Sequence, residues 1–452
     1  MEASAIASSL GVENVETVII AAVDMQGRLF GKRVPAGEYL RVRETGVNIS
    51  SCALGWDLSQ SVGLKVDLTG YHTGWNDFKL VPDVATLRRL DWLNKTALVF
   101  ADIVEISTGA AVRVSPRSIL RREVDACAKN ELYPKVGTEL EFFLFKSRYE
   151  EVRARSYRGL TPTTQARSQD LINRETNAVE PFFERLRGAL IRSGVDVAFS
   201  ESEWGYGQWE VNLLHHDPLQ MADRQLLLKL AVKDIADEFG LSATFMAKPH
   251  SHDVGSSCHV HCSMEDARGR NLFASDEADL ARRRTLQGAL GGVLRYMDEL
   301  MVWYAPTINA YRRTASQQFA GHGKTWGIDN RTVTCRVCGE TGHSSRFEFR
   351  VPGSDVNPYL ALAGLVASAR QGISDNLEAG PPIHGDGYKE AGPSRTPQSL
   401  RDAVALFESS NFNLTTFGED VVRHYAAHAM FEVEQFATAV TDWERERYFE
   451  GV

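Results

Sequence analysis

Charged side chains lie within four stretches of the sequence that otherwise resemble apolar strands. The stretch VGTELEFFLF carries Glu139 and Glu141, and SSCHVHCSM carries His259 and His261. Successive side chains of a strand point to opposite faces, so residues two apart share a face. Each pair therefore projects from one side of its strand, where both members could act on one ligand.

Two further stretches repeat this pattern. SRFEFRV alternates Arg346, Glu348 and Arg350 with phenylalanines, and SEWGYGQWEVNLL places Glu203 and Glu210 around a Gly-rich bend. For any one stretch, a solvated sheet face with ordinary alternation is the alternative. Taken together, the four stretches put five glutamates, two histidines and two arginines into apolar strands. Buried charges must be paired or bind metal, so the set needs a chemical reason.

The donor types favour a hard divalent cation. Carboxylate oxygens with a single imidazole suit Mg²⁺ or Mn²⁺ better than zinc. Two such ions side by side, with arginines nearby, would neutralise the charge of a phosphate in transfer. The residues therefore indicate metal-assisted phosphoryl transfer, and a zinc hydrolase built on the H-x-H pair remains an alternative.

Two other motifs are weaker than they look. Cys335, Cys338 and His343 have the C-x2-C-x4-H spacing of a zinc knuckle but lack a fourth ligand nearby. We interpret residues 337–345 as a turn between two strands and the cysteines as small apolar side chains. GHGKT resembles the end of a P-loop, but Gln318 stands where the motif requires glycine.

Strands and helices that could position these residues follow from the local pattern. Val15–Asp24 and Thr96–Ile103 are expected to be buried strands, with a hairpin after the first. Pro116 should open a helix that runs to about Asn130. Helices are also expected in FFERLRGALIRSG, in DPLQMADRQLLLKLAVKDIADEFG after its Asp-Pro cap, and in NPYLALAGLVASARQGI. The order is not a clean β-α-β-α alternation, so we predict an α+β fold.

The composition restricts the possible partners and the compartment. A formal net charge of −9 argues against a nucleic-acid or anionic-membrane partner. No stretch approaches the length of an apolar membrane span. The six cysteines are sparse for 452 residues, which indicates a reducing cytoplasm rather than a disulfide framework.

Several blocks resemble the glutamine synthetase family in order and approximate spacing. They are TELEFFLF, GQWEVN, ATFMAKP with GSSCHVHCSM, APTINAYRR, WGIDNRT and RFEFRVPGSDVNPYLA. The resemblance covers roughly residues 15–450, and it is specific because independent blocks agree. DMQGRLFGKR, SPRSILRRE, YRGLTP and TDWERERYFE are similar to the actinobacterial glutamine-synthetase-like branch, which joins glutamate to amines other than ammonia.

The resemblance implies an architecture and an assembly. Residues 1–110 would form a small β-grasp-like N-terminal domain. Residues 111–452 would form a large catalytic domain with a curved antiparallel sheet and flanking helices. Active sites would lie between neighbouring subunits of hexameric rings that stack as a dodecamer.

The resemblance also implies roles for individual residues, with ATP and two or more Mg²⁺ or Mn²⁺ ions in each active site. The ligands of the metal nearer the incoming amine would be Glu141, Glu203 and Glu210. The ligands of the metal that bridges the ATP phosphates would be Glu139, His259 and Glu348. The ATP contacts would be His261, Ser263, Arg331, Arg336 and Arg346. Glutamate would be held by Gly255, Arg313 and Arg350, and the catalytic residues would be Arg331, Glu203 and Arg350.

The implied reaction activates a carboxylate that an amine cannot attack directly. Phosphate from ATP would convert the γ-carboxylate of glutamate into an acyl phosphate, which has a good leaving group. The amine would then attack, with metals and arginines providing electrostatic stabilisation. The site must exclude water while the acyl phosphate exists.

Three departures from the family concern the ammonium end of the site. The D-G-S-S motif that binds ammonium is absent, although Asp57 lies in the corresponding region. Phe319 occupies the position of the flap glutamate, and Val254 that of an asparagine. A small cation needs an anionic cage, so these changes favour a carbon-bearing amine. Phe319 and Trp56 suggest an apolar amine, with simple packing as the alternative.

Tyr388 lies near the position at which some relatives are adenylylated, but the residues around it do not match that site.

We therefore predict a γ-glutamylamine synthetase acting on a polyamine, ethanolamine, or an alkyl or aromatic amine. Glutamine synthesis from ammonia is the main alternative. A metal-dependent hydrolase using the H-x-H pair and a catalytically inactive sensor are the other two hypotheses.

Overall fold

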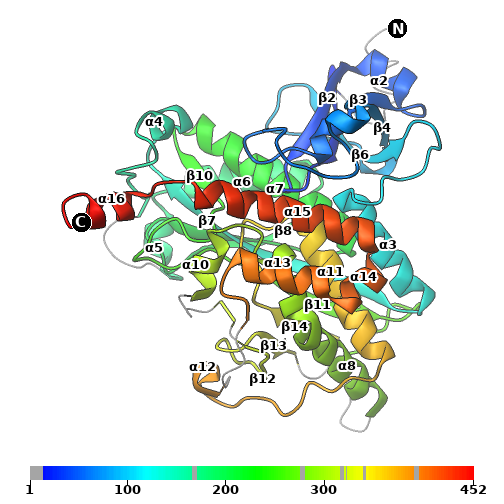
Figure 1. Cartoon of the computed structure of the whole chain (residues 1–452), viewed down its shortest axis with the longest axis vertical. Helices are drawn as coiled ribbons and strands as arrows, with labels where there is room; N and C mark the ends of the chain where they lie inside the picture. The colour runs from blue at the N-terminus through cyan, green and yellow to red at the C-terminus, as the bar shows by residue number, and fades with distance from the viewer. Residues whose placement is uncertain are drawn as a thin grey trace.

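The computed structural model describes residues 14–164, 170–274, 280–315, 320–321, 323–339, 343–390 and 396–452. It contains two sheets, the first built from residues 17–105 and the second from residues 133–349. In Figure 1 the first sheet lies at the top and the second crosses the body of the molecule below it. Both sheets carry helices, so the predicted α+β class is confirmed.

The first sheet is mixed and has the order β2-β1-β6-β4-β3, with β5 added to β6. The central strands β1 and β6 run parallel, and the other pairs are antiparallel. One helix, α2, lies between β2 and β3 in the chain. The bounds are β1 Thr17–Val23, β2 Leu29–Pro35, α2 Ala36–Val42, β3 Val47–Ser50, β4 Asp77–Pro82, β5 Arg88–Arg89 and β6 Thr96–Glu105.

The second sheet has the order β12-β13-β14-β11-β7-β9-β8, with β10 beside β7. It is antiparallel, as predicted, except that β12 and β13 run parallel. The bounds are β7 Tyr133–Phe145, β8 Val197–Ser202, β9 Gln208–Leu213, β10 Ser242–Thr244, β11 Cys258–Glu265, β12 Trp326–Ile328, β13 Cys335–Cys338 and β14 Arg346–Phe349. The antiparallel pair β13 and β14 confirms the two predicted strands. The strand β13 runs to Cys338, so residues 337 and 338 belong to it rather than to the predicted turn, and residues 340–342 lie outside the described part of the chain.

Helices pack around the second sheet and bury its apolar residues. The longer ones are α3 Pro116–Lys129, α6 Glu180–Arg192, α7 Pro218–Glu238, α8 Leu280–Tyr296, α11 Pro358–Ser374, α13 Leu400–Ser409 and α15 Glu419–Ala437. The shorter ones are α4 Tyr149–Ala154, α5 Asn173–Thr176, α9 Met301–Tyr304, α10 Ala310–Ala315, α12 Gly387–Glu390, α14 Asn411–Thr416 and α16 Asp442–Tyr448.

Two of the predicted helix starts, those of α7 and α11, are confirmed by their caps. The Asp217 side chain accepts a hydrogen bond from the Gln220 amide at 3.1 Å, and Asn357 caps α11 through the Tyr359 amide, also at 3.1 Å. In the part of the chain that the structure describes, every helix is too short or too polar to cross a bilayer.

Candidate active site

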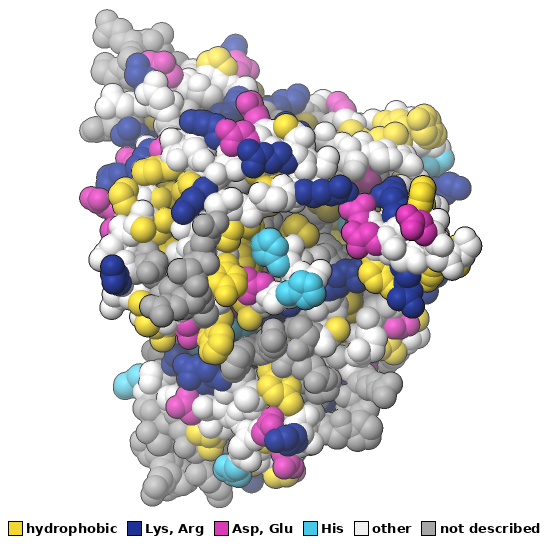
Figure 2. Space-filling view, turned by 90° about the vertical axis from the view of Figure 1, so that its left-hand side faces the viewer, with side chains coloured by type: hydrophobic (Ala, Val, Ile, Leu, Met, Phe, Trp, Pro, Cys, Tyr) yellow, Lys and Arg dark blue, Asp and Glu magenta, His cyan; other side chains and the backbone are white. Residues whose placement is uncertain are grey.

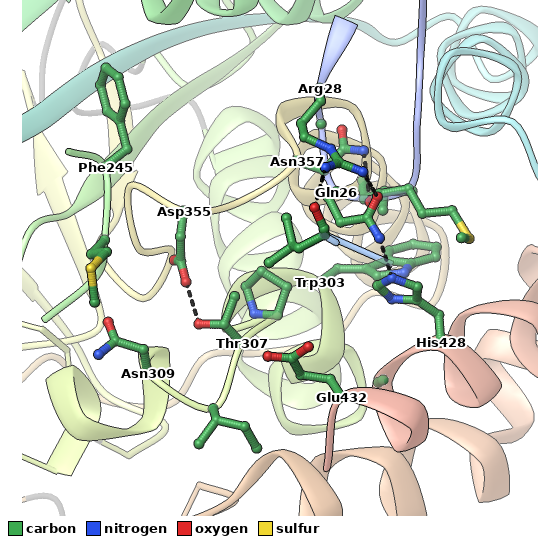
Figure 3. A pocket seen from close by; sticks show the side chains of 18 of the residues that line it. Gln26, Arg28, Phe245, Trp303, Thr307, Asn309, Asp355, Asn357, His428 and Glu432 are labelled. Carbon is green, nitrogen blue, oxygen red and sulfur yellow. Dashed lines mark hydrogen bonds between the residues drawn. The ribbon is translucent and has the colours of Figure 1, made fainter. Parts of the chain in front are cut away.

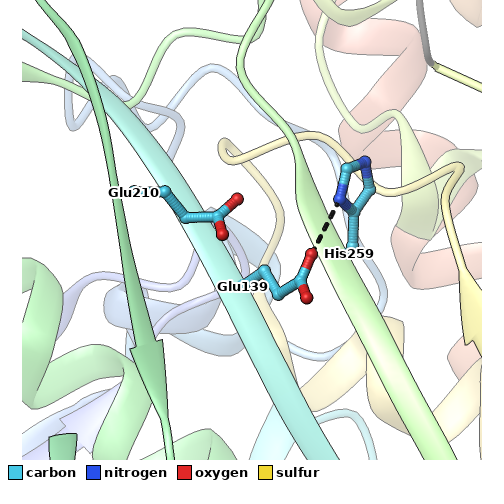
Figure 4. Close-up of side chains that lie close together, drawn as sticks. All are labelled: Glu139, Glu210 and His259. Atoms are coloured by element: carbon cyan, nitrogen blue, oxygen red, sulfur yellow. Dashed lines mark hydrogen bonds and ion pairs between the residues drawn. The ribbon is translucent and has the colours of Figure 1, made fainter. Parts of the chain in front are cut away.

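The pairing of β7 with both neighbours brings the predicted acids together. Glu139 and Glu141 lie on β7, where their side chains share a face. On one side, Glu141 is opposite Glu210 of β9; on the other, Glu139 is opposite His259 of β11. Figure 4 shows Glu139, Glu210 and His259 projecting from these three strands. Residues as far apart in the chain as 139 and 259 thus meet through sheet register.

Three overlapping groups of donors result, and in each the ligand atoms all lie within 4.8 Å of one another. The groups are Glu141, Glu203 and Glu210; Glu139, Glu210 and His259; and Glu139, His261 and Glu348. The structure therefore brings together all six side chains that the sequence suggested as metal ligands, and adds His261.

The first group concentrates negative charge. Burial and then the charge of Glu141 raise the pKa of Glu203 to about 9. Burial and the neighbouring glutamates also raise the pKa of Glu210 well above its ordinary value. Glu141 is held in place by Gln208, whose Nε2 donates to its Oε2 at 2.7 Å, and by the Ser257 amide at 2.9 Å. Three mutually close carboxylates in this setting require a cation to stay ionised.

The other half of the site carries its own positive charge. His259 Nδ1 lies 3.2 Å from Glu139 Oε2, and His261 Nε2 lies 2.7 Å from Glu139 Oε1. Burial alone would raise the pKa of Glu139, but these imidazoles lower it. Glu348 is 1% exposed and pairs with Arg350 and, at 3.0 Å, with Arg336. Burial opposes ionisation there too, yet Arg350 and His259 hold the pKa of Glu348 below its ordinary value.

These residues fit divalent metal ions of the Mg²⁺ or Mn²⁺ type. The donor set is mostly carboxylate oxygen, which such ions prefer. His259 Nε2 is buried and has no hydrogen-bond partner among the described residues, so this nitrogen is available to bind a metal ion. Cys335 and Cys338 are buried free thiols and belong to none of the three groups found in the described chain. The site therefore contains Glu348, which follows the zinc-knuckle-like motif in the sequence, and does not contain the two cysteines of that motif.

A cavity of about 310 Å³ adjoins the second half of the site. Glu139, His261, Ser263 and Arg346 all line it. Arg346 Nε donates to His261 Nδ1 at 3.1 Å, which links the cavity wall to the metal group. Three of the five residues that the resemblance assigned to ATP thus share one cavity.

The remaining two ATP residues lie outside this cavity's lining. Arg331 is exposed, and Arg336 donates to Asp329 Oδ1 from Nε at 3.0 Å as well as to Glu348. Sequence reasoning missed Asp329, and its motif WGIDNRT was the available signal.

Of the residues assigned to glutamate, Arg313 and Arg350 are buried and Gly255 is half-buried. Arg313 is 2% exposed, and its guanidinium donates to the Val351 carbonyl at 2.8 Å and to Ser257 Oγ at 2.7 Å. Gly255 accepts a hydrogen bond from Gln208 Nε2 at 3.0 Å. A Cβ at Gly255 would lie 2.6 Å from the Ala247 carbonyl oxygen, so only glycine fits this approach.

Sequence reasoning also missed two residues that orient the acids. Gln208 holds Glu141, and Asn212 Nδ2 donates to Glu210 Oε1 at 2.8 Å. Both lie two residues from Glu210 on β9, so strand periodicity in GQWEVN could have identified them.

The departures at the ammonium end are only partly visible. Phe319 lies outside the described residues. Asp57 caps its own loop, accepting from the amides of Ser59 at 2.9 Å and Ser61 at 2.7 Å, and belongs to none of the three groups of the described chain. Trp56 Nε1 donates to Asp24 at 3.2 Å, which supports a packing role.

Comparison with known proteins agrees with this geometry. The model of the glutamine synthetase catalytic domain matches residues 113–448. The gamma-glutamylethanolamide synthetase GlnA4 of Streptomyces coelicolor is 40% identical over 440 residues, covering 97% of this chain and 93% of that protein. The glutamate–isopropylamine ligase of a Pseudomonas species is 33% identical over 441 residues, covering 97% and 95%. The gamma-glutamylputrescine synthetase PuuA of Escherichia coli is 30% identical over 447 residues, covering 96% and 91%.

Solved structures give the same result for the fold. The structure described as a GmaS/ADP complex superposes with a TM-score of 0.85 at 25% identity, and apo GmaS with 0.84 at 26%. Each comparison covers 99% of both chains. With its acids gathered by sheet register and its family model matched over most of its length, the chain belongs to the glutamine synthetase family.

Proposed function

We propose that the protein is an ATP-dependent ligase that joins the γ-carboxylate of glutamate to an organic amine through a γ-glutamyl phosphate. The observation that carries this proposal is the set of donor groups on one sheet face, with a cavity of about 310 Å³ at one side. Phosphoryl transfer to a carboxylate and attack by an amine need such a charged, water-poor site.

The proposed metal sites use both halves of the donor cluster. One ion would be held by Glu141, Glu203 and Glu210, which form one of the three donor groups. Another would be held by Glu139, His259 and Glu348, where His259 Nδ1 lies 3.2 Å from Glu139 and 3.4 Å from Glu348. When bound, these ions would neutralise charge on the phosphates. Oxygen ligands support Mg²⁺ or Mn²⁺ in either site.

The chain's own residues would divide the remaining tasks. Arg331, Arg336 and Arg346 would meet the phosphates. Of these arginines, Arg346 shares the cavity wall with His261 and Ser263. Arg313 and Arg350 would bind the carboxylates of glutamate. The backbone of Gly255 would accept a hydrogen bond from the ammonium group of glutamate. Glu203 would be the carboxylate nearest the incoming amine. These assignments rest on the match between this sequence and the family's motifs.

An organic amine is favoured over ammonia for two reasons. The D-G-S-S motif is absent, and Phe319 replaces the flap carboxylate, so the cage for a small cation has lost charge. Three matched relatives are named for ethanolamine, isopropylamine and putrescine products, at 40%, 33% and 30% identity. Ammonia remains the second candidate, since relatives named glutamine synthetase also match, one from Dictyostelium discoideum at 32%.

A panel of amines tests the proposal. Phosphate release would be measured with glutamate, ATP and Mg²⁺ against ethanolamine, isopropylamine, putrescine, an aromatic amine and ammonia. At least one organic amine should exceed ammonia in kcat/KM by about tenfold or more, which is about 1.4 kcal/mol in the barrier. The Glu141→Gln variant should abolish the signal and so trace it to this site.

The opposite outcome is equally clear. If ammonia outperforms every organic amine at neutral pH, the protein is a glutamine synthetase. Turnover without ATP would favour a hydrolase, and nucleotide binding without any turnover would favour a sensor.

We also propose a ring-shaped homo-oligomer in the cytoplasm, with a domain boundary near residue 110. Large aromatic side chains are exposed, including Trp204, Trp443 and Phe449, and an assembly would cover such surface. Figure 2 shows hydrophobic side chains gathered in the middle of one face, among interspersed acidic and basic ones. All six cysteines are free, which suits a reducing compartment. Light scattering would distinguish six from twelve subunits.

A further inference from the structure

A second cavity lies away from the acid cluster, where the turn after β1 meets α7, residues 302–312 and α15 (Figure 3). Its volume of about 560 Å³ is in the range of small-molecule sites. None of its lining residues belongs to the three donor groups or to the cavity beside His261. The reaction proposed above does not use it.

The positive charge at one end of this cavity forms no ion pair among the described residues. Lys229 and Lys233 lie one turn apart on α7, with their Nζ atoms 5.5 and 5.9 Å from the centre of the Phe245 ring. Among the described residues, no carboxylate approaches either ammonium within 4.0 Å. Lys229 Nζ donates to the Val356 carbonyl at 3.0 Å, which uses one of its three N–H groups. Burial lowers the pKa of Lys229 to about 8, although Cys258 and Asp355 act in the opposite direction.

Two carboxylates also line the cavity without pairing to these lysines. Asp355 Oδ2 accepts a hydrogen bond from the Thr307 hydroxyl at 2.6 Å. Glu432 extends from α15 toward the middle of the cavity in Figure 3, and no ion pair is found for it in the described chain. Burial raises the pKa of both carboxyls. Opposite charges therefore face one space. Asp355 and Lys229 attract each other, but in the described chain no ion pair within 4.0 Å joins either acid to either lysine.

The two arginines of the lining are already engaged. Arg28 pairs with Asp24 at 2.7 Å, and Arg312 lies over the Phe436 ring at 5.7 Å. Between the charged groups the lining is largely apolar, with Phe245, Met246, Val302, Pro306, Ile308 and Leu360. A matching ligand must carry a negative group, a positive group and a short apolar part.

We propose that this cavity is a binding site for a small α-amino acid with an apolar side chain. Its carboxylate would lie between Lys229 and Lys233, its ammonium would face Glu432 and Asp355, and its side chain would cover the apolar lining. A simple carboxylic acid would leave the two acids without a partner, and a simple amine would leave the two lysines without one. A desolvated charge without a partner is costly, so both should bind less well.

Three probes that differ by one charged group test this proposal. Leucine has both groups, 4-methylpentanoate lacks the ammonium, and 3-methylbutylamine lacks the carboxylate. Calorimetric titrations would use the full-length protein with saturating glutamate, ADP and Mg²⁺, so that the proposed active site is occupied. Leucine should bind with a Kd of about 0.1–1 mM, and each truncated probe about tenfold more weakly or worse.

Single substitutions locate the binding. Lys229→Met and Lys233→Met should each weaken leucine about tenfold, and Glu432→Gln should do the same from the other end. Lys389→Met, on exposed α12, is the matched control and should leave leucine binding unchanged. Thermal melting of each variant checks that it is folded. If the Lys229→Met variant does not fold, the Lys233→Met variant, which changes an exposed residue, still tests the site.

The proposal is overturned if leucine does not bind the wild-type protein, or if a truncated probe binds as tightly as leucine. It is also overturned if the lysine and Glu432 variants bind leucine like the wild type. A defect of the proposed ligase reaction would not affect these titrations, because they measure binding without turnover.

Discussion

Glu210 on β9 and Glu348 on β14 are 4% and 1% exposed, yet their carboxyl groups have opposite electrostatic surroundings. Glu210 faces other glutamates, and its pKa rises after burial and their charges are counted. Glu348 meets Arg350 and His259, which lower its pKa although burial acts against them. One half of the site therefore depends on a cation from solution, whereas in the other half the protein's own arginine and histidine supply counter-charge.

The largest expected effect comes from removing a charge in the cation-dependent half. Glu210→Gln should lower kcat by about 10³-fold, because the lost carboxylate weakens electrostatic stabilisation of the phosphoryl group. Phosphate release with glutamate, ATP and the best amine measures it. Glu265→Gln, at the end of β11 and outside the donor groups, is the control and should be nearly fully active. Equal activity of the two variants would contradict the proposal that catalysis depends on the carboxylate of Glu210.

In the Glu348 half of the site, a substitution should act on stability. Arg350→Met leaves the buried Glu348 with less compensation, so the free energy of unfolding should fall by about 3 kcal/mol. Urea unfolding followed by circular dichroism measures this change. The double variant Arg350→Met, Glu348→Leu should recover part of the loss, since no buried charge is left. A loss below about 1 kcal/mol in the single variant would contradict the assignment.

Metal binding should stabilise the protein more at high pH than at low pH. The unfolded chain releases the Glu203 proton near the ordinary pKa of 4.5, whereas the folded chain holds it up to about 9. The metal-free protein therefore loses stability as pH rises between these values. Mg²⁺ needs the ionised carboxylate, so its stabilisation should grow over the same window, to about 2.7 kcal/mol at a hundredfold excess over Kd.

Melting temperatures with and without Mg²⁺, at about pH 6 and about pH 8.5, measure this effect. EDTA should reverse it. A shift that is equal at both pH values, or larger at the lower one, would contradict the raised pKa of Glu203.

A smaller effect, on the stability of the metal-free protein, distinguishes the Glu210 half of the site from the Glu348 half most directly. In metal-free buffer, Glu210→Gln should raise the free energy of unfolding by about 1 kcal/mol, because it removes one of several mutually repelling carboxyls. The same variant is therefore expected to be inactive but more stable. Destabilisation by Glu210→Gln would show that the acids are balanced by the protein after all.

The smallest effect is expected at the cysteines. Cys338→Ser should change kcat by less than about twofold, since the thiol lies outside the donor groups of the described chain. Metal analysis of the purified variant should give the same content as the wild type. A loss of bound zinc would restore the knuckle interpretation.

The periodicity of each strand predicts which residues of the site share a face, but it does not predict which strands are neighbours in the sheet. The two-residue spacing correctly placed Glu139 with Glu141, and His259 with His261, on shared faces. The sequence does not reveal that β7 lies between β9 and β11, because strand order depends on packing between distant segments. The parallel pairing of β12 and β13 was not predicted for the same reason.

The charge balance was also hidden from the sequence. The strand pattern put Arg346, Glu348 and Arg350 on one face, but it did not show that Arg346 bonds to His261 while Arg350 pairs with Glu348. Which carboxylate gains a counter-charge depends on side-chain reach across strands. The family and the fold class, by contrast, follow from motif order alone and are confirmed.

The register of β7 has a consequence for folding. Glu141 opposite Glu210 and Glu139 opposite His259 hold only if the strand pairs without slippage on both edges. A shift of one residue would turn both glutamates to the other face and separate every donor group at once. Divalent metal ions would therefore bind only correctly aligned chains and select them during refolding, acting as a check on strand alignment.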